Sequence, residues 1–389
     1  MPERDGAPGL DAMLAAKEMV LVCGSGGVGK TTTAAALAAT AATHLGGRVL
    51  VLTVDPARRL ADALGIGALG NTATRVSDEA FSAAGVEPRG ELWAAMLDTK
   101  AGWDELIRRH APDAKVREAV LANPLYVNIT SRFVHSHDYL AMEQLHELHA
   151  SGRYDLIVVD TPPSRSALDV LDAPGRMKEF FESRLLRWLT VPYRSRLFTA
   201  ASKPFYSVAD RILGSRFLQD IAEFFILFQA MEKRFVAHAT AVERLLGDHR
   251  TTFVVVSTLE AAPAREAAYL ARALKQRDFH LGAIIANRVL PAEFTAKGAA
   301  NSAKRLHAAS GGQLATRVAA EIDLPADVVS STLDAAASRF HDIALVATRE
   351  AERRAELESL STVVLTAPTF DRDINDVADL LALGEHLRG

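Results

Sequence analysis

The sequence predicts an α/β protein: a doubly wound, mainly parallel sheet with an inserted helical, hydrophobic subdomain. Three observations support this fold class. Short apolar runs rich in β-branched residues alternate with helix-like stretches, as in parallel sheets that are covered by helices on both faces. A glycine-rich loop joins the first apolar run to an alanine-rich helix. Two long stretches contain no strand-like run, and the second of them is unusually aromatic.

Seven segments have the length and composition of buried strands, and helix-like sequence separates most of them. Right-handed crossovers would place the carboxyl ends of these strands at one edge of the sheet, where ligands usually bind. The segments are residues 19–23, 48–54, 92–97, 155–160, 252–257, 281–286 and 362–366.

Composition narrows the class of protein further. The 389 residues are 49% hydrophobic and 24% charged, as expected for a globular chain, and the net charge of -4 argues against a bulk nucleic-acid binder. Cys23 is the only cysteine, so no internal disulfide or Cys-x-x-Cys metal site can form. No apolar run reaches signal-peptide or membrane-spanning length. We therefore expect a cytoplasmic protein, with peripheral contact to a membrane as an option.

The glycine-rich loop, residues 24–31, reads GSGGVGKT and fits the phosphate-binding pattern G-x-x-x-x-G-K-[ST]. Glycines let backbone N–H groups point at phosphate oxygens, and the helix N-terminus favours negative charge. Lys30 would reach the terminal phosphates, and the Thr31 hydroxyl would ligate Mg²⁺. The pattern thus predicts a P-loop NTPase that binds ATP and Mg²⁺. The predicted contacts are Gly24, Ser25, Gly26, Gly27, Val28, Gly29, Lys30, Thr31 and Thr32.

Two aspartates end later strands. Asp160 closes the run DLIVVD, as a Walker-B carboxylate does, and would bind a water held by Mg²⁺. Asp55 follows residues 48–54 and would orient the water that attacks the γ-phosphate; a turn or cap before Pro56 is the alternative. We predict that Asp55, Lys30 and Asp160 are catalytic, and that Thr31, Asp55 and Asp160 form the metal site.

Two further strand ends are expected to frame the base. Asn287 follows the run GAIIA, and Pro368 follows TVVLTA. An Asn carboxamide can hydrogen-bond an adenine edge, and a proline ring can pack on its face. Taken locally, each is more often a turn residue.

Together, these motifs resemble those of the ArsA-like ATPases, the family of arsenite-pump and tail-anchored-protein-targeting ATPases within the deviant-Walker P-loop proteins. The family loop GKGGVGKTT appears as GSGGVGKTT, and the two family switches DPAHSLSD and DTAPTGHTLR appear as DPARRLAD and DTPPSRSALD. The adenine-side motifs appear as ANRVLP and TAPTFDRDINDVADL. Order and spacing agree over nearly the whole chain.

The resemblance implies a dimeric ATPase with nucleotides at the dimer interface, whose closure on ATP reshapes a helical hydrophobic region that holds a client. It gives Asp55, Thr31 and Asp160 the roles proposed above, and makes Asn287 and Pro368 the adenine contacts. The P-loop ATPase core would comprise residues 15–103, 150–173 and 249–389, and the helical client-binding subdomain residues 104–149 and 174–248.

The chain also departs from the family pattern. Ser25 stands where the family carries a lysine that reaches the phosphates of the partner subunit. Either an arginine on the switch segments (Arg58, Arg59 or Arg165) substitutes for it, or a paralogous partner supplies the lysine, so homodimer and heterodimer both stay open. In the second case the chain would be a weakly hydrolysing regulatory subunit. The metalloid-binding cysteines and the zinc-clamping Cys-x-x-Cys are missing, so we expect neither arsenite binding by thiolates nor an interfacial zinc.

The aromatic insert leaves two interpretations open. Its apolar residues follow helical spacing and form either plain core or an adaptable groove for a hydrophobic or amphiphilic client. The segment is also basic, which suits a membrane surface or a client with an anionic head. The two apolar faces are Met177, Phe181, Leu185, Trp188 and Leu189, and Phe217, Ile221, Phe224, Phe225, Phe228, Met231 and Phe235.

His135 and His137 lie two residues apart in the sequence RFVHSHDYL. No further ligand is placed by spacing to complete a metal site with them. We therefore interpret them as polar residues at a helix start.

Overall fold

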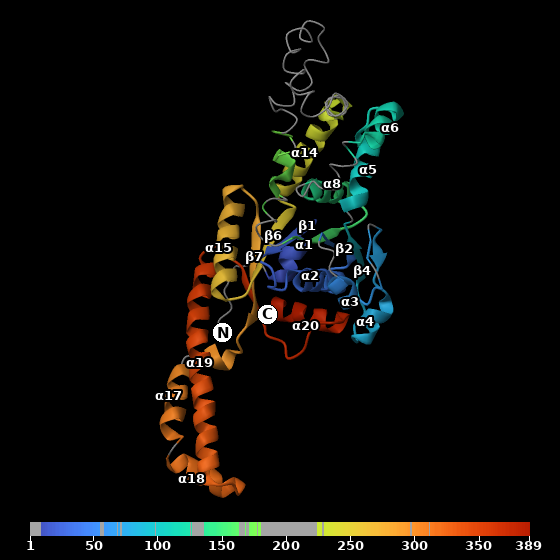
Figure 1. The fold of residues 1–389 in the computed structure, drawn as a ribbon. Helices are drawn as coiled ribbons and strands as arrows, with labels where there is room; N and C mark the ends of the chain where they lie inside the picture. Colours follow the sequence, from blue (N-terminus) through green and yellow to red (C-terminus); the bar gives the residue numbers. More distant parts are fainter. Residues whose placement is uncertain are drawn as a thin grey trace, which may run out of the picture.

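The computed structural model shows a central sheet between two groups of helices, with a separate helical extension (Figure 1). It describes residues 9–389 apart from 55–57, 68, 71, 98, 125, 127–135, 163–167, 169–170, 177, 180–223, 228, 296–297 and 311.

The sheet has eight strands in the order β3-β4-β2-β5-β1-β6-β7-β8. All neighbouring strands are parallel except β3 and β4, which confirms the predicted doubly wound α/β class. Seven strands lie at the predicted segments, and the two-residue β3 is additional. The strands are β1 (Met19–Gly24), β2 (Gly47–Thr53), β3 (Thr74–Arg75), β4 (Gly90–Met96), β5 (Leu156–Asp160), β6 (Thr251–Ser257), β7 (Leu281–Val289) and β8 (Val364–Pro368).

Strand β1 occupies the topological switch point of the sheet. The chain leaves β1 toward β2 on one side and reaches β6 on the other, so loops diverge at its carboxyl end. In parallel sheets this crevice is where ligands bind. The register pairs Val22 of β1 with Asp160 of β5, which brings that carboxylate beside the start of the glycine-rich loop.

Both faces of the sheet are buried, as the continuous apolar strands predict. On β1, Val20 and Val22 point to a core shared with α1 (Leu10–Ala15), α2 (Lys30–His44) and α20 (Val377–Arg388). Met19, Leu21 and Cys23 point to the opposite core, which includes α8 (Ser136–Ala150), α14 (Glu232–Leu246) and α15 (Ala261–Gln276). The short helices α3 (Arg58–Ala63) and α4 (Asp78–Ala83) lie beside α2 and α20, respectively.

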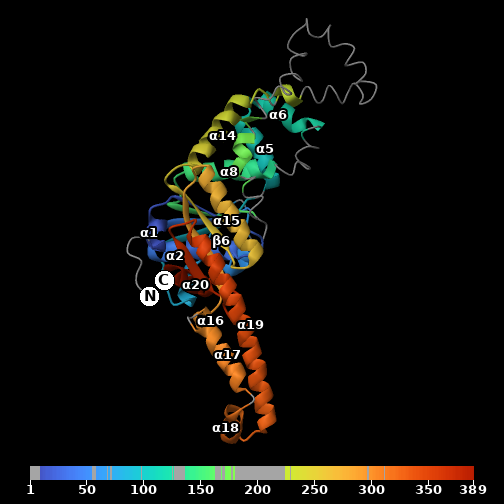
Figure 2. The same ribbon diagram turned by 90° about the vertical axis from the view of Figure 1, so that its left-hand side faces the viewer.

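Helices α5 (Thr99–His110), α6 (Ala114–Ala122), α8 and α14 gather at one end of the molecule (Figures 1 and 2). They enclose a core of their own, to which α5 gives Leu106 and Ile107. From the predicted aromatic face, Phe224, Met231 and Phe235 are buried in this core. These three therefore serve as packing residues. Phe225 is partly buried against the same core. Phe217, Ile221 and Phe228, and the members of the upstream face (Met177, Phe181, Leu185, Trp188 and Leu189), lie outside the described residues.

Helices α17, α18 and much of α19 form an extension that reaches away from the sheet, at the end opposite α5 and α6 (Figures 1 and 2). The sequence does not predict this extension: its residues fall within the predicted ATPase core, because helix-like and strand-like segments alternate there. The helices are α16 (Ala292–Thr295), α17 (Ala299–Ala309), α18 (Gln313–Ile322) and α19 (Ala326–Glu358).

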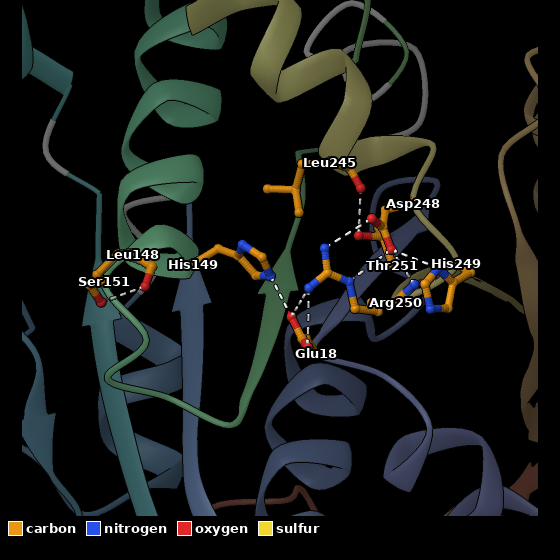
Figure 3. A network of polar contacts seen from close by, with 9 residues as sticks. All are labelled: Glu18, Leu148, His149, Ser151, Leu245, Asp248, His249, Arg250 and Thr251. Carbon is orange, nitrogen blue, oxygen red and sulfur yellow. Dashed lines mark hydrogen bonds and ion pairs between the residues drawn. The ribbon is translucent and has the colours of Figure 1, made fainter.

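A polar network fixes α8 and α14 to the base of the sheet (Figure 3). Just before β1, Glu18 accepts a hydrogen bond of 3.2 Å from Arg250 and lies 2.8 Å from Nε2 of His149. Arg250 also donates to Asp248, and Thr251 donates to the carbonyl of Leu245 at 2.7 Å. The hydrogen bond from Arg250 lowers the pKa of Asp248 well below its usual range. The C-terminal ends of both helices are thus anchored beside β1.

Within the described part of the chain, no helix combines the length and the apolar character needed to cross a membrane.

Candidate nucleotide site

The glycine-rich loop follows β1 and ends at α2, as predicted. Gly27 and Gly29 have φ angles of 79° and 94°, a region that L side chains rarely adopt. A Cβ on Gly24 would overlap the carbonyl oxygen of Val256 on the neighbouring strand β6. Conformation and close approach therefore explain why glycine occupies these positions.

Lys30 is the first residue of α2 and is only 8% exposed. Its Nζ donates a 2.9 Å hydrogen bond to the carbonyl oxygen of Ser25. The ammonium group is thereby held over the loop, at a helix N-terminus that favours anions. Ser25 is 9% exposed, and its hydroxyl makes no hydrogen bond within the described residues. Ser25, which stands where the family carries a lysine, is therefore buried within its own chain.

Three oxygen-bearing side chains converge beside Lys30. The Thr31 hydroxyl donates to Oδ2 of Asp160 at 2.7 Å, and the Thr53 hydroxyl donates to the same oxygen at 3.1 Å. Asp160 is 1% exposed. Two hydroxyls and a carboxylate make a hard oxygen donor set, which fits Mg²⁺. Thr53 was not predicted, although its place at the end of β2, directly before the first switch, is the signal that points to it.

Cys23 and Thr161 are neighbours of this cluster on β1 and directly after β5. The Thr161 hydroxyl donates to the carbonyl of Val22 at 2.9 Å, which links the start of the second switch to β1. Cys23 is fully buried in the sheet core, and burial raises the pKa of its thiol to about 11. The single cysteine is therefore a core residue, as its position on a buried strand suggests.

Asn287 braces the glycine-rich loop from β7. Its Nδ2 donates to the carbonyl of Val28 at 2.8 Å, and its Oδ1 accepts from the backbone N–H of Arg288 at 3.0 Å. The register between β7 and β8 shifts at this point, and Arg288 has a φ of 57°. Such a bulge re-aims side chains next to functional sites. A Cβ on Gly29 would overlap Nδ2 of Asn287, so the loop and the strand end fit each other closely.

A cavity of about 630 Å³ opens beside the loop and joins the predicted base contacts to the predicted phosphate contacts. Asn287 and Pro368 line it from the ends of β7 and β8, opposite Gly29, Thr31 and Thr32 of the loop and α2. The volume is ordinary for a small-molecule site. Arg288 and the β8–α20 residues Phe370 and Arg372 also line it and were not predicted.

Several predicted residues have no described geometry. Asp55 and Arg165 lie outside the described residues. Arg58 and Arg59 begin α3, but nothing is described of their side chains. Their roles stay predictions, while Gly24, Ser25, Lys30, Thr31, Asp160, Asn287 and Pro368 are placed around one loop.

Comparison with known protein families gives a match over most of the chain. The family model described as anion-transporting ATPase, ArsA_ATPase, matches residues 17–310. The match begins just before β1 and ends after α17, so it includes the glycine-rich loop, both switches and Asn287.

Individual relatives share about a third or less of their residues with this chain over the matched region. An uncharacterised protein of Streptomyces coelicolor is 30% identical over 273 residues, which cover 70% of this chain and 62% of that protein. An ATPase ASNA1 homolog of Leishmania infantum is 31% identical over 187 residues, with 42% and 45% covered. An ATPase ASNA1 homolog of Paramecium tetraurelia is 26% identical over 278 residues, with 70% and 74% covered. The chain thus spans less than two thirds of the Streptomyces and Leishmania proteins.

Proposed function

Because the chain belongs to the ArsA family of anion-transporting ATPases, we propose that it binds ATP at the glycine-rich loop and hydrolyses it to ADP and phosphate. The observation that carries this proposal is the convergence of Thr31, Thr53 and Asp160 beside Lys30, at the N-terminus of α2. Cation, amide donors and oxygen ligands are the parts that phosphoryl transfer requires in P-loop enzymes.

Each part has a distinct task in the proposed reaction. Lys30 leaves its hydrogen bond to the Ser25 carbonyl and neutralises charge on the terminal phosphates, which loop amides also contact. Thr31 and Asp160 would hold Mg²⁺, and the bound ion supplies electrostatic stabilisation of the phosphates. Asp55 orients the attacking water. Asn287 and Pro368 position the adenine in the cavity, and Asn287 keeps the loop in shape through Val28.

A matched pair of lysine variants tests the phosphate site. Lys30→Ala removes the buried ammonium group, and we expect turnover to fall by about 100-fold or more. Lys17→Ala is the control, because Lys17 lies away from the loop and donates its hydrogen bond to the carbonyl of His249. Equal turnover in both variants would remove Lys30 from the mechanism.

Replacement of Asp55 tests its predicted role in orienting the attacking water. Asp55→Asn should retain ATP binding and lose hydrolysis; unchanged hydrolysis would remove the role of Asp55.

We further propose that the ATPase acts as a dimer that couples its nucleotide state to the binding and release of a hydrophobic or amphiphilic client. The support is family membership together with a helical end that has its own core next to the sheet. In this proposal, residues 104–149 and 174–248 bind the client, in the cytoplasm or at a membrane surface. Because Phe224, Met231 and Phe235 are core residues, the client surface must use other side chains. Purification from the native cell, followed by identification of what accompanies the chain, tests this; recovery of the chain alone with and without ATP would contradict it.

A second candidate function rests on Ser25. If a paralogous subunit supplies the lysine that this position lacks, the chain is a weakly hydrolysing regulatory subunit of a heterodimer. The buried, uncharged serine supports this alternative. A homodimer of the purified chain that hydrolyses ATP at rates typical of the family would exclude it.

A further inference from the structure

Three side chains from three different helices meet in the helical end of the molecule: His110, Glu143 and His238. His110 is the last residue of α5, Glu143 lies in the middle of α8, and His238 lies in the middle of α14. Nε2 of His110 and Nδ1 of His238 each lie 2.9 Å from the same oxygen, Oε1 of Glu143. One ligand atom from each residue lies within 4.8 Å of the other two.

The residue types of this cluster suit a transition-metal ion. Two imidazoles and one carboxylate form the donor set of many zinc centres, in which a fourth position stays open. Zinc bonds of 2.0–2.1 Å imply ligand atoms about 3.3 Å apart in a tetrahedral site. The two 2.9 Å separations to Oε1 of Glu143 are a few tenths of an ångström shorter than this, and all three ligand atoms lie within 4.8 Å of one another.

Burial separates this cluster from ordinary surface pairs. The side chains of His110 and Glu143 are each only 3% exposed, whereas that of His238 is 38% exposed. The His110 ring also lies on Phe235, with ring centroids 4.9 Å apart. The contact with Phe235 helps to fix the ring of His110, and the partly exposed ring of His238 marks the side of the cluster that faces solvent.

The surrounding structure holds the ligands in place before any ion arrives. The polar network of Figure 3 anchors the C-terminal ends of α8 and α14 next to β1 through Glu18, His149 and Arg250. Glu143 lies six residues before His149 on α8, about 9 Å along the helix axis. Both helices therefore present their ligands from a fixed base.

His146 supplies a further nitrogen close by. It follows Glu143 by one helical turn, and its ring centroid lies 5.9 Å from that of His238. Its Nδ1 is buried and makes no hydrogen bond within the described residues.

We propose that His110, Glu143 and His238 bind one divalent transition-metal ion of the zinc class, which joins α5, α8 and α14. Residue spacing in the sequence does not reveal this site, because its ligands come from three helices far apart in the chain. Of the closely spaced pair His135 and His137, His135 lies outside the described residues, and the side chain of His137 is not described.

A competition titration tests the proposal. The full-length chain is stripped with a chelator, exchanged into metal-free buffer and titrated with Zn²⁺ against a chromophoric chelator. We expect one tightly bound equivalent, whose affinity falls by about 100-fold in both His238→Gln and Glu143→Gln. Zn²⁺ should also raise the Tm of the wild type, and at the same Zn²⁺ concentration it should raise that of His238→Gln much less. The partly exposed His238 keeps the test valid if Glu143→Gln fails to fold.

Two controls separate this site from other places where Zn²⁺ could bind. His307→Gln alters an exposed histidine that lies 3.2 Å from Asp334 on the opposite extension, and it should keep wild-type affinity. Asp160→Asn should also keep it, because that residue belongs to the nucleotide site. No tight Zn²⁺ binding by the wild type would overturn the proposal. So would wild-type affinity in His238→Gln, or loss of affinity in Asp160→Asn.

Discussion

The Thr31 hydroxyl donates a 2.7 Å hydrogen bond to Asp160, which links the first turn of α2 to the end of β5 across 129 residues of sequence. This contact joins the phosphate-binding loop to the Walker-B strand. A parallel sheet with β1 at the switch point brings the two together, because β1 and β5 are neighbours in register.

Replacing Thr31 tests whether its oxygen matters. Thr31→Val keeps the shape and removes the hydroxyl, so turnover in Mg²⁺ should fall at least about tenfold. Thr31→Ser retains the oxygen and should stay near the wild-type rate. Steady-state phosphate release measures both variants. Equal rates for serine and valine would show that the contact is structural only.

Gly29→Ala should damage the loop through both its backbone conformation and its packing. An alanine here would have to keep the φ of 94°, which L residues rarely adopt, and its Cβ would overlap Nδ2 of Asn287. Both the backbone conformation and the packing would therefore be disturbed. Gly85→Ala is a matched control with a φ of 74° and open space around the Cβ. The control should lose about 1–2 kcal/mol of unfolding free energy, whereas Gly29→Ala should lose more and bind ATP weakly. Similar ATP affinity in the two variants would contradict the fit between Gly29 and Asn287.

Cys23 gives a prediction about pH. Burial raises the thiol pKa from about 9 in the unfolded chain to about 11 in the folded protein. The stability that comes from the neutral thiol is therefore complete below pH 9 and is lost as the pH rises toward 11. Iodoacetamide at pH 8.5 should leave the folded chain unmodified and alkylate it in denaturant. Rapid alkylation of the folded chain would show that β1 opens readily.

Ser25→Lys examines the position at which this chain leaves its family. If the missing lysine limits a homodimer, this variant should hydrolyse ATP several times faster than the wild type, with Ser25→Ala as the uncharged control. Ser25 is 9% exposed in one chain, so the longer side chain must turn outward to reach a partner. An unchanged rate in a variant that folds and dimerises would count against the missing-lysine account.

The sheet and the glycine-rich loop could be predicted from the sequence because their signals are local. Apolar runs define seven strands, and the glycine spacing defines the site of Lys30 and Thr31. The role of Thr53 could not be predicted, because it depends on the register between β2 and β5. Arg288 and the hydrogen bond from Asn287 to Val28 could not be predicted either, because they depend on the register shift between β7 and β8. The His110–Glu143–His238 cluster depends on helix packing, which residue spacing alone does not specify.

The helical extension of α17, α18 and α19 was missed for another reason. Its residues are helix formers between two strands, so the alternating pattern of an α/β sheet accounts for them equally well. Only the three-dimensional arrangement shows that α19 runs over 33 residues and leaves the sheet.

The most direct test of the central claim is phosphate release from ATP by the purified full-length chain, with Mg²⁺ and with excess EDTA, in the wild type and in Asp160→Asn. We expect release that requires Mg²⁺ and falls by about 100-fold in Asp160→Asn, while circular dichroism shows that the variant keeps its fold. Release that is independent of Mg²⁺, or equal in the two proteins, would contradict it.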